Sequence, residues 1–457
     1  MDKLKLMKMK LEQDLIGMLK ELDGMNWLLL GLVLFIALVT GVFALRYLKG
    51  DRRRGIFLVQ MSALAVSLSL MVVAKNLMVL FGALGVSNIL LVSLMVHERG
   101  WGASRASGRL AALTLGGGLL AVGLAFWLIY QSTGTLAVGE INQTGLSGTT
   151  QLAVSGLLLV GAMAQSGLWP MHRWVLSSLN SPTPVSAFMH AGLINGGGIL
   201  LVRFAPIYAS ESMIMTLVFL TGLVSAVLGT VWMLMQSDVK RTLACSTMGQ
   251  MGFMVMQCGL GLFPAAVAHL CWHGLFKANQ FLSTGGLWKE KKVVEGGVIS
   301  PLKLAAAIVC GVVGAWGFAL ASRKSLIPQD TDFVLVFICM LAGAQFALPI
   351  LRGASFMRIL WAMPATWVMG IVYGCSVYIV EMILAPLGLH NAYALNIFHV
   401  GGMAVMFGGW LALLYLPQLS GTRVFGGATQ KLYVRLLNAG QPHPATVTSC
   451  RNHYRFS

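Results

Sequence analysis

The chain has 457 residues, of which 57% are hydrophobic and only 10% are charged. Soluble domains carry about a quarter charged residues, so this composition excludes an ordinary soluble enzyme and indicates a polytopic membrane protein surrounded by lipid. The formal net charge of +17 is accompanied by no nucleic-acid-binding motif. We therefore expect no nucleic-acid partner, and we attribute the positive charge to membrane orientation.

Apolar stretches long enough to cross the hydrocarbon layer, about 20 residues each, recur along the chain. They are apolar all round instead of alternating with polar residues, which favours helices over the strands of a barrel. We predict an all-α polytopic membrane protein with about thirteen spans. These lie near residues 25–47, 58–75, 76–96, 109–131, 152–170, 184–207, 212–235, 242–262, 264–286, 302–321, 332–350, 359–382 and 395–416.

The distribution of lysine and arginine predicts the orientation, because basic residues collect in cytoplasmic loops. With thirteen spans, most basic residues between the spans fall on one side. The other side holds five lysines before residue 25 and four later residues, Lys75, Arg203, Arg323 and Lys324. We therefore expect a transmembrane domain over residues 25–416 and a cytoplasmic C-terminal tail over residues 417–457.

The first 24 residues place apolar side chains at helical spacing beside a polar face. This pattern is typical of an amphipathic segment that lies in the membrane interface. Alternatively, translation starts at Met25 and the stripe has no structural meaning. The sequence leaves these two readings open.

The segment "HLCWHGLFK" carries three basic or imidazole groups inside a predicted span. His269, His273 and Lys277 stand at i, i+4 and i+8, so they share one helix face over about 12 Å. Ionisable groups in a bilayer are costly and mark ion pathways, and imidazole titrates near neutral pH. The row predicts a proton or cation path with bridging water. The alternative is a hydrogen-bonded seam between helices, and a zinc site on the two histidines lacks a third ligand nearby.

Two segments resemble interrupted helices. The first spans residues 163–192 and contains Pro170, Pro182 and Pro184, which remove backbone donors. In the second, "GFALASRKSLIPQDTD", Lys324 follows an apolar run. Interrupted helices at matched positions of two repeats mark ion sites in transporters, although both segments can also be loops between spans.

Four motifs together resemble the antiporter-like subunits, which include the L-type subunit of respiratory complex I and the large subunit of Mrp sodium/proton antiporters. They are "SPTPVSAFMHAGLINGGGILLVRF" (181–204), "SDVKRTLACSTMGQMGFM" (237–254), "HLCWHGLFKANQFLSTG" (269–285) and "GFALASRKSLI" (317–327). The resemblance covers roughly residues 55–330. It implies two inverted five-helix repeats, each with a broken helix, and a central polar axis of Lys, His and Glu.

Site residues follow from this resemblance by position. His190 corresponds to the bridging histidine of the first repeat, and Lys277 and Lys324 correspond to the central and exit lysines of the second. The motif residues Asp238, Lys240 and Arg241 correspond to a cytoplasmic helix start.

The first repeat departs from the family pattern. Ala83 and Leu84 stand near the place of the family's glutamate, and Gln165 stands at the place of its lysine. The Glu–Lys pair of this repeat is thus missing, which argues against an ordinary proton path there.

A narrower resemblance rests on two features, which are this departure and the tail "LYVRLLNAGQPHPATVTSCRNHYRF" (432–456). Both are similar to DabB, the family of membrane subunits of the DabA–DabB inorganic-carbon pump in the bacterial inner membrane. The resemblance implies a transporter subunit without its own cofactor or metal, and a zinc-containing cytoplasmic DabA-like partner that hydrates CO2. The alternatives are an ion-translocating subunit of a complex I-like or Mrp-type complex, and a non-conducting membrane anchor.

Overall fold

The computed structural model describes residues 22–285, 299–351, 357–389, 392–419 and 426–447. Within these ranges every element longer than a short turn is an α-helix, which confirms the predicted all-α class. The amphipathic segment predicted for residues 1–24 lies almost wholly outside the described residues, and so does the end of the predicted tail.

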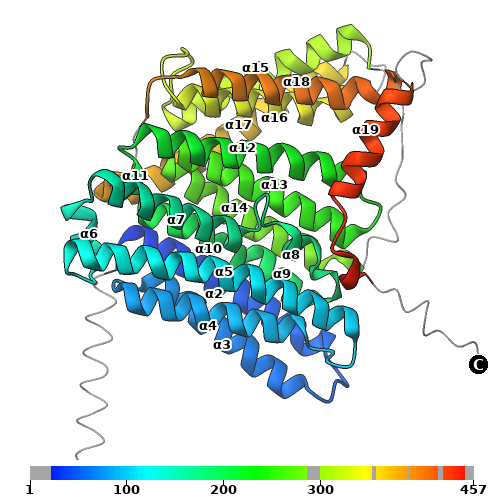
Figure 1. Ribbon diagram of the computed structural model, residues 1–457. Coiled ribbons are helices and arrows are strands. Elements are labelled where there is room, and N and C mark those ends of the chain that lie inside the picture. Colours follow the sequence, from blue (N-terminus) through cyan, green and yellow to red (C-terminus); the bar gives the residue numbers. More distant parts are fainter. Residues whose placement is uncertain (1–21, 286–298, 352–356, 390–391, 420–425, 448–457) are drawn as a thin grey trace, which may run out of the picture.

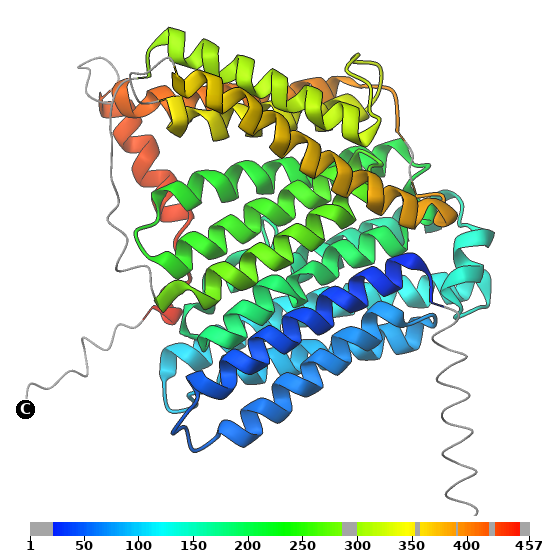
Figure 2. The ribbon, with the colours of Figure 1, turned by 180° about the vertical axis from the view of Figure 1, so that it is seen from behind.

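Twelve long helices form the body of the molecule and run side by side in Figures 1 and 2. They are α2 (Gly24–Tyr47), α3 (Arg54–Val73), α4 (Leu77–Met95), α5 (Gly102–Thr133), α7 (Gly148–Ser166), α12 (Ser212–Met235), α13 (Val239–Gly259), α14 (Phe263–Leu282), α15 (Pro301–Ser322), α16 (Asp332–Leu351), α17 (Met357–Leu384) and α18 (Ile397–Leu419).

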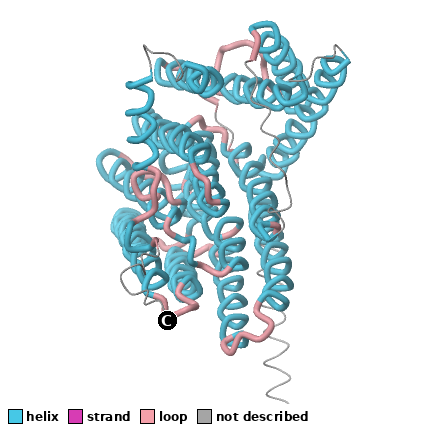
Figure 3. Tube along the Cα trace, turned by 90° about the vertical axis from the view of Figure 1, so that its right-hand side faces the viewer, coloured by secondary structure: helices cyan, strands magenta, loops and turns pink. Residues whose placement is uncertain are grey.

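Shorter helices connect or interrupt them. These are α6 (Val138–Thr144), α8 (Arg173–Leu176), α9 (Thr183–Ala191), α10 (Gly196–Arg203), α11 (Ala205–Tyr208) and α19 (Gly426–Ala439), with 3₁₀ turns η1 (Ser178–Asn180), η2 (Leu193–Asn195), η4 (Ala385–Leu387) and η5 (Pro444–Thr446). Figure 3 shows a group of helices packed at one side of the main bundle, and Figure 1 identifies these as α15 to α18.

Among the described residues, ten segments are long and apolar enough to cross a membrane. Three further predicted spans coincide with α7, α13 and α14, which do not belong to this group. Each of the three carries several polar side chains, which lower its mean hydropathy. The count of thirteen and the inverted repeats therefore stay predictions.

The helix over residues 183–203 is interrupted, and the interruption differs in place from the one predicted. Pro182 and Pro184 stand at the start of α9, where a missing backbone donor costs little. The chain leaves the α-helix after Ala191, passes through η2 and resumes as α10. These two prolines thus begin this helix instead of breaking it, and Pro170 lies in the connection between α7 and α8.

Side chains satisfy the backbone carbonyls that the interruption releases. Asn195 Nδ2 donates to the carbonyl of Ala191 at 2.8 Å, and Ser166 Oγ donates to that of Ile194 at 2.8 Å. A break inside a membrane helix is tolerated only when such groups are paired within the protein. Gly197 allows the close approach of α7, because a Cβ there would lie 2.3 Å from Ser166 Oγ.

The second predicted interruption is a connection between two helices. Arg323 ends α15 with a left-handed φ of 58°, and α16 begins only at Asp332. A left-handed residue stops the helical hydrogen-bond ladder, so the loop interpretation of this segment is the correct one.

Candidate functional site

Lys277 lies near the C-terminal end of α14 and is completely buried (0% exposed). Its Nζ donates to Ser246 Oγ at 2.8 Å, to the carbonyl of Leu243 at 3.3 Å and to Gln280 Oε1 at 3.4 Å. Two of these acceptors belong to α13 and one to α14. All three are uncharged, so none of them forms an ion pair with the ammonium group.

The predicted row continues from Lys277 along α14. The rings of His269 and His273 lie nearly parallel with their centroids 6.1 Å apart. His273 Nε2 lies 3.2 Å from the carbonyl oxygen of His190. Because a carbonyl oxygen only accepts, this nitrogen is the donor. The row therefore reaches the interrupted helix in its last turn before the break.

His190 itself is buried in the last turn of α9, and its ring stacks on Phe281 with centroids 4.4 Å apart. Its Nδ1, and the Nε2 of His269, are buried without a hydrogen-bond partner in the structure. Unsatisfied buried nitrogens of this kind are uncommon and indicate positions for water or an exchanging proton.

The motif residues Asp238, Lys240 and Arg241 lie at the start of α13. Asp238 is its N-cap and accepts from the backbone N–H of Arg241 at 2.9 Å. Lys240 Nζ donates to the carbonyl of Ser181 at 3.0 Å, just before α9. The motif thus joins α13, which supplies two acceptors of Lys277, to the segment before α9, which carries His190.

Lys324 lies in the connection after α15, and two carboxylates surround it. Its Nζ is 3.1 Å from Glu381 Oε2 and 3.3 Å from Asp332 Oδ1. These three side chains and Ala265, near the start of α14, line one small pocket. The 12 residues from Ala265 to Lys277 span about 18 Å of helix, so α14 runs between the Lys324 cluster and Lys277.

Sequence reasoning did not assign the two carboxylates to the site. The sequence marks Glu381 as a candidate, since it is an acidic residue inside a predicted span. Local spacing does not identify Lys324 as its partner. Asp332 is the first residue of α16, where it resembles an ordinary helix-start acid.

The first half of the molecule, here α2 to α10, contains a pair of neutral amide side chains, and one of them, Gln165, stands at the place of the family's lysine. Gln165 Nε2 donates to Asn88 Oδ1 at 3.1 Å and lies 3.4 Å from the carbonyl of Leu193 in the broken helix. Both side chains are buried. Asn88 was not predicted, because the motif comparison pointed to Ala83 and Leu84.

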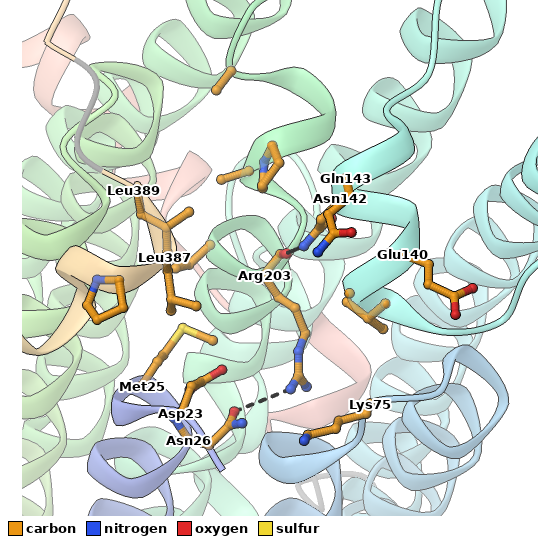
Figure 4. A pocket seen from close by; sticks show the side chains of 18 of the residues that line it. Asp23, Met25, Asn26, Lys75, Glu140, Asn142, Gln143, Arg203, Leu387 and Leu389 are labelled. Carbon is orange, nitrogen blue, oxygen red and sulfur yellow. Dashed lines mark hydrogen bonds between the residues drawn. The ribbon is translucent and has the colours of Figure 1, made fainter. Parts of the chain in front are cut away.

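A cavity of about 1140 Å³ opens beside the start of α2 and the end of α10, where Asn26 and Arg203 line it (Figure 4). Arg203, the last residue of α10, is buried beside it and donates to the carbonyl of Met71 at 3.0 Å and to Asn26 Oδ1 at 3.3 Å. Tyr393 lines the same cavity, and its backbone N–H donates to Thr331 Oγ1 at 3.1 Å. Thr331 precedes Asp332, so the cavity wall adjoins the Lys324 cluster.

Within the described ranges, no three His, Cys, Asp or Glu side chains gather closely enough to share a metal ion. That zinc is held by a partner protein stays an expectation. The chemistry that the described residues support is the movement of a proton or small cation along a row of polar groups.

Comparison with known proteins identifies the family. Residues 74–375 match the NADH:quinone oxidoreductase/Mrp antiporter transmembrane family. The probable inorganic carbon transporter subunit DabB of Bacillus anthracis is 38% identical over 285 residues, covering 60% of this chain and 54% of the relative. The corresponding subunit DabB1 of Halothiobacillus neapolitanus is 36% identical over 275 residues, covering 58% and 49%. The predicted similarity to DabB subunits is thus confirmed.

NADH-quinone oxidoreductase subunit L of Pseudomonas aeruginosa is 32% identical over 319 residues, covering 67% of this chain and 51% of the relative. The chain therefore spans about half the length of the curated relatives it matches. The Mrp complex from Dietzia sp. DQ12-45-1b shares the fold, with a TM-score of 0.56 and 21% identity over 92% of this chain and 45% of that one. Because the family match covers well over half of the chain, the protein is a multi-pass membrane protein that belongs to the NADH:quinone oxidoreductase/Mrp antiporter transmembrane family.

Proposed function

We propose that this chain conducts protons or sodium ions down their gradient across a bacterial inner membrane and thereby drives the accumulation of inorganic carbon. A DabA-like, zinc-containing protein docked on the cytoplasmic side would hydrate CO2. The similarity to subunits named as inorganic carbon transporters supports the substrate class. The row from His269 to Lys277 on α14 is the observation that carries the conducting role.

Lys277 can exchange a proton without breaking an ion pair with its acceptors. Its ammonium group donates to a carbonyl, a hydroxyl and an amide oxygen, all of them neutral. Lys324, in contrast, is held between Asp332 and Glu381, where loss of its charge would leave two carboxylates unbalanced. We therefore assign the switching charge to Lys277 and a fixed, connecting charge to Lys324.

The histidines would relay between these two lysines with water. The 6.1 Å between the ring centroids of His269 and His273 is too long for direct transfer in this ring arrangement, so a bridging water is required. The buried nitrogen of His269 that lacks a partner is a site for such a water. The cavity beside Arg203 would be the opening on the outer side, since Lys75 and Arg203 fall on the side predicted to face away from the cytoplasm.

The decisive experiment is inorganic-carbon uptake in cells that carry Lys277→Ala. We expect uptake to fall to the level of cells without the protein, at an unchanged amount of protein in the membrane. Lys49→Ala, an exposed lysine after the end of α2, is the matched control and should retain uptake. Normal uptake in Lys277→Ala would contradict the conducting role and favour a membrane anchor.

The Mrp-like fold supports a second candidate function, which is ion exchange without carbon chemistry. Purification of the chain from native membranes in mild detergent, with mass spectrometry and zinc analysis, separates the two. A large zinc-bearing protein in roughly equal amount supports the carbon pump. Recovery of several small antiporter subunits or of iron–sulfur proteins would move the chain to the other branch.

A further inference from the structure

The segment Gly440–Val447, here called the C-terminal strap, follows α19. In Figure 1, α19 (red) crosses the ends of the long helices, and the strap continues from it towards α8 and α9. This is the end of the bundle that holds Lys277, because α13 begins there and α14 ends there.

The strap contacts α12 and the start of α13. Gly440 packs on the indole of Trp232 so closely that a Cβ there would lie 2.7 Å from Trp232 Cγ. Arg241 Nη1 donates to Gln441 Oε1 at 3.1 Å. The strap thus packs tightly against α12 through Gly440 and holds the first turn of α13 by the side-chain hydrogen bond of Gln441.

The strap also holds the segment that leads into α9. The backbone N–H of His443 donates to Ser177 Oγ at 3.1 Å, and Asn180 Nδ2 donates to the carbonyl of Thr446 at 2.9 Å. Lys240 on α13 donates to the carbonyl of Ser181, just before α9, and so links these two helix starts directly. The starts of α9 and α13 are therefore fastened both to each other and to the strap.

These two helices position the groups around Lys277. Leu243 and Ser246, which accept from its ammonium group, follow Arg241 by two and five residues on α13. His190, whose carbonyl accepts from His273, lies on α9. A shift of either helix start would therefore change the hydrogen bonds of the row.

We propose that the C-terminal strap is a positioning element for Lys277, which sets the distance between its ammonium group and its acceptors on α13. The strap acts through Arg241 at the start of α13 and through Ser177 and Asn180 before α9, and its hydrogen bonds do not involve the conducting groups. This inference rests on the proposed function, since it assumes that Lys277 exchanges the transported ion. Displacing the strap should loosen α13 at its start, lower transport and change its dependence on pH.

A pair of glycines gives a matched test. In Gly440→Val the new side chain collides with Trp232 and pushes the strap away, whereas Gly427 on α19 has no neighbour within 4 Å of an added Cβ. Gly427→Val therefore adds the same side chain without a clash. Gln441→Leu removes only the acceptor of Arg241, and Gln441→Glu retains an acceptor there.

Cys245 serves as a native reporter of the strap. It lies on α13, is completely buried, and belongs to the apolar cluster that contains Trp232. We would label the purified complex with a water-soluble maleimide, locate the modified cysteines by mass spectrometry, and measure uptake in cells as a function of pH.

Gly440→Val and Gln441→Leu should raise the labelling of Cys245 several-fold, lower uptake and shift its pH profile. Gly427→Val and Gln441→Glu should resemble the wild type. Unchanged labelling and uptake in both disruptive variants would overturn the inference, and so would lower uptake with an unchanged pH profile, which indicates a purely structural role. If labelling rises although Lys277→Ala retains uptake, the strap positions α13 but the proposed function fails.

Discussion

The two halves of the molecule place different chemistry beside the same broken helix. On one side, Gln165 of α7 contacts the carbonyl of Leu193 and pairs with Asn88. On the other side, His273 of α14 contacts the carbonyl of His190, and the row continues to Lys277. Both contacts serve backbone carbonyls near the interruption, but only the second belongs to a row of titratable groups.

This difference separates two tasks that a polar group in a membrane performs. A broken membrane helix needs donors for its released carbonyls, and an amide satisfies them as well as a charged group does. Moving a proton requires a group that can gain and lose one near neutral pH, which an amide cannot do. The first half thus has the groups for the structural task but lacks those that the proposed conducting task needs.

The largest loss of uptake should come from replacing the charged side chain of Lys277 with an amide like that of Gln165. Lys277→Gln keeps a polar side chain at this position but removes its exchangeable charge, and we expect uptake to be abolished. Gln165→Leu in the first half should leave most of the uptake intact, because no titratable group is lost. Uptake assays of both variants at matched membrane levels test this, and equal losses in the two would contradict the division of tasks.

A smaller loss is expected from His273→Gln. The amide can still donate to the carbonyl of His190, so the broken helix stays satisfied, but the relay loses a titratable ring. We expect uptake to fall by about 10²-fold at most, the lower range for a positioned acid–base group. Measurement of uptake across pH 6 to 8 should show a flatter profile than in the wild type. A wild-type rate and profile would exclude His273 from the path.

In the first half the effect should appear in stability. Gln165→Leu leaves the carbonyl of Leu193 and the buried Asn88 without this donor, at a cost of about 1–3 kcal/mol in the free energy of unfolding. The thermal midpoint of the purified protein should therefore fall, while that of Gln329→Leu, an exposed loop glutamine, should not. An unchanged midpoint in Gln165→Leu would mean that water replaces the amide.

Local sequence patterns predict the parts of this site that lie on one helix. The i, i+4, i+8 spacing of His269, His273 and Lys277 reports a shared face, and α14 covers it as one uninterrupted helix. The motif at Asp238 likewise marks a helix start, because its carboxylate accepts from a backbone N–H three residues later. Such relations depend only on helix geometry.

The partners of these groups depend on packing between distant helices, which spacing does not report. Glu381 and Asp332 approach Lys324 from α17 and α16, 57 and 8 residues away in sequence. Proline is the strongest local signal for a break, so the predicted interruption lies at the prolines. The actual interruption follows Ala191, and it depends on Asn195, Ser166 and Gln165, which pair with its carbonyls.

The smallest effect concerns a half-buried pair, Asp51 and His97, that lies apart from the row. Asp51 lies between α2 and α3, accepts from the ring of His97 at 2.8 Å and from the backbone N–H of Arg53 at 2.6 Å. The hydrogen bond from His97, followed by that from Arg53, lowers the pKa of Asp51 below its ordinary value of 3.8. Because the folded pKa is lowered, the stabilisation is present above pH 3.8 and is lost as the pH falls through the folded value.

We therefore expect Asp51→Asn to lower the thermal midpoint at pH 7 by about 1–2 °C, as is typical of pairs near the protein surface. The difference from the wild type should disappear in acid, since the protonated aspartate also loses its charge. Uptake at neutral pH should be unchanged, because the pair touches neither the row nor the broken helix. A pH-independent difference would assign the effect to packing, and a loss of uptake would show that conduction also depends on a titratable group in the first half.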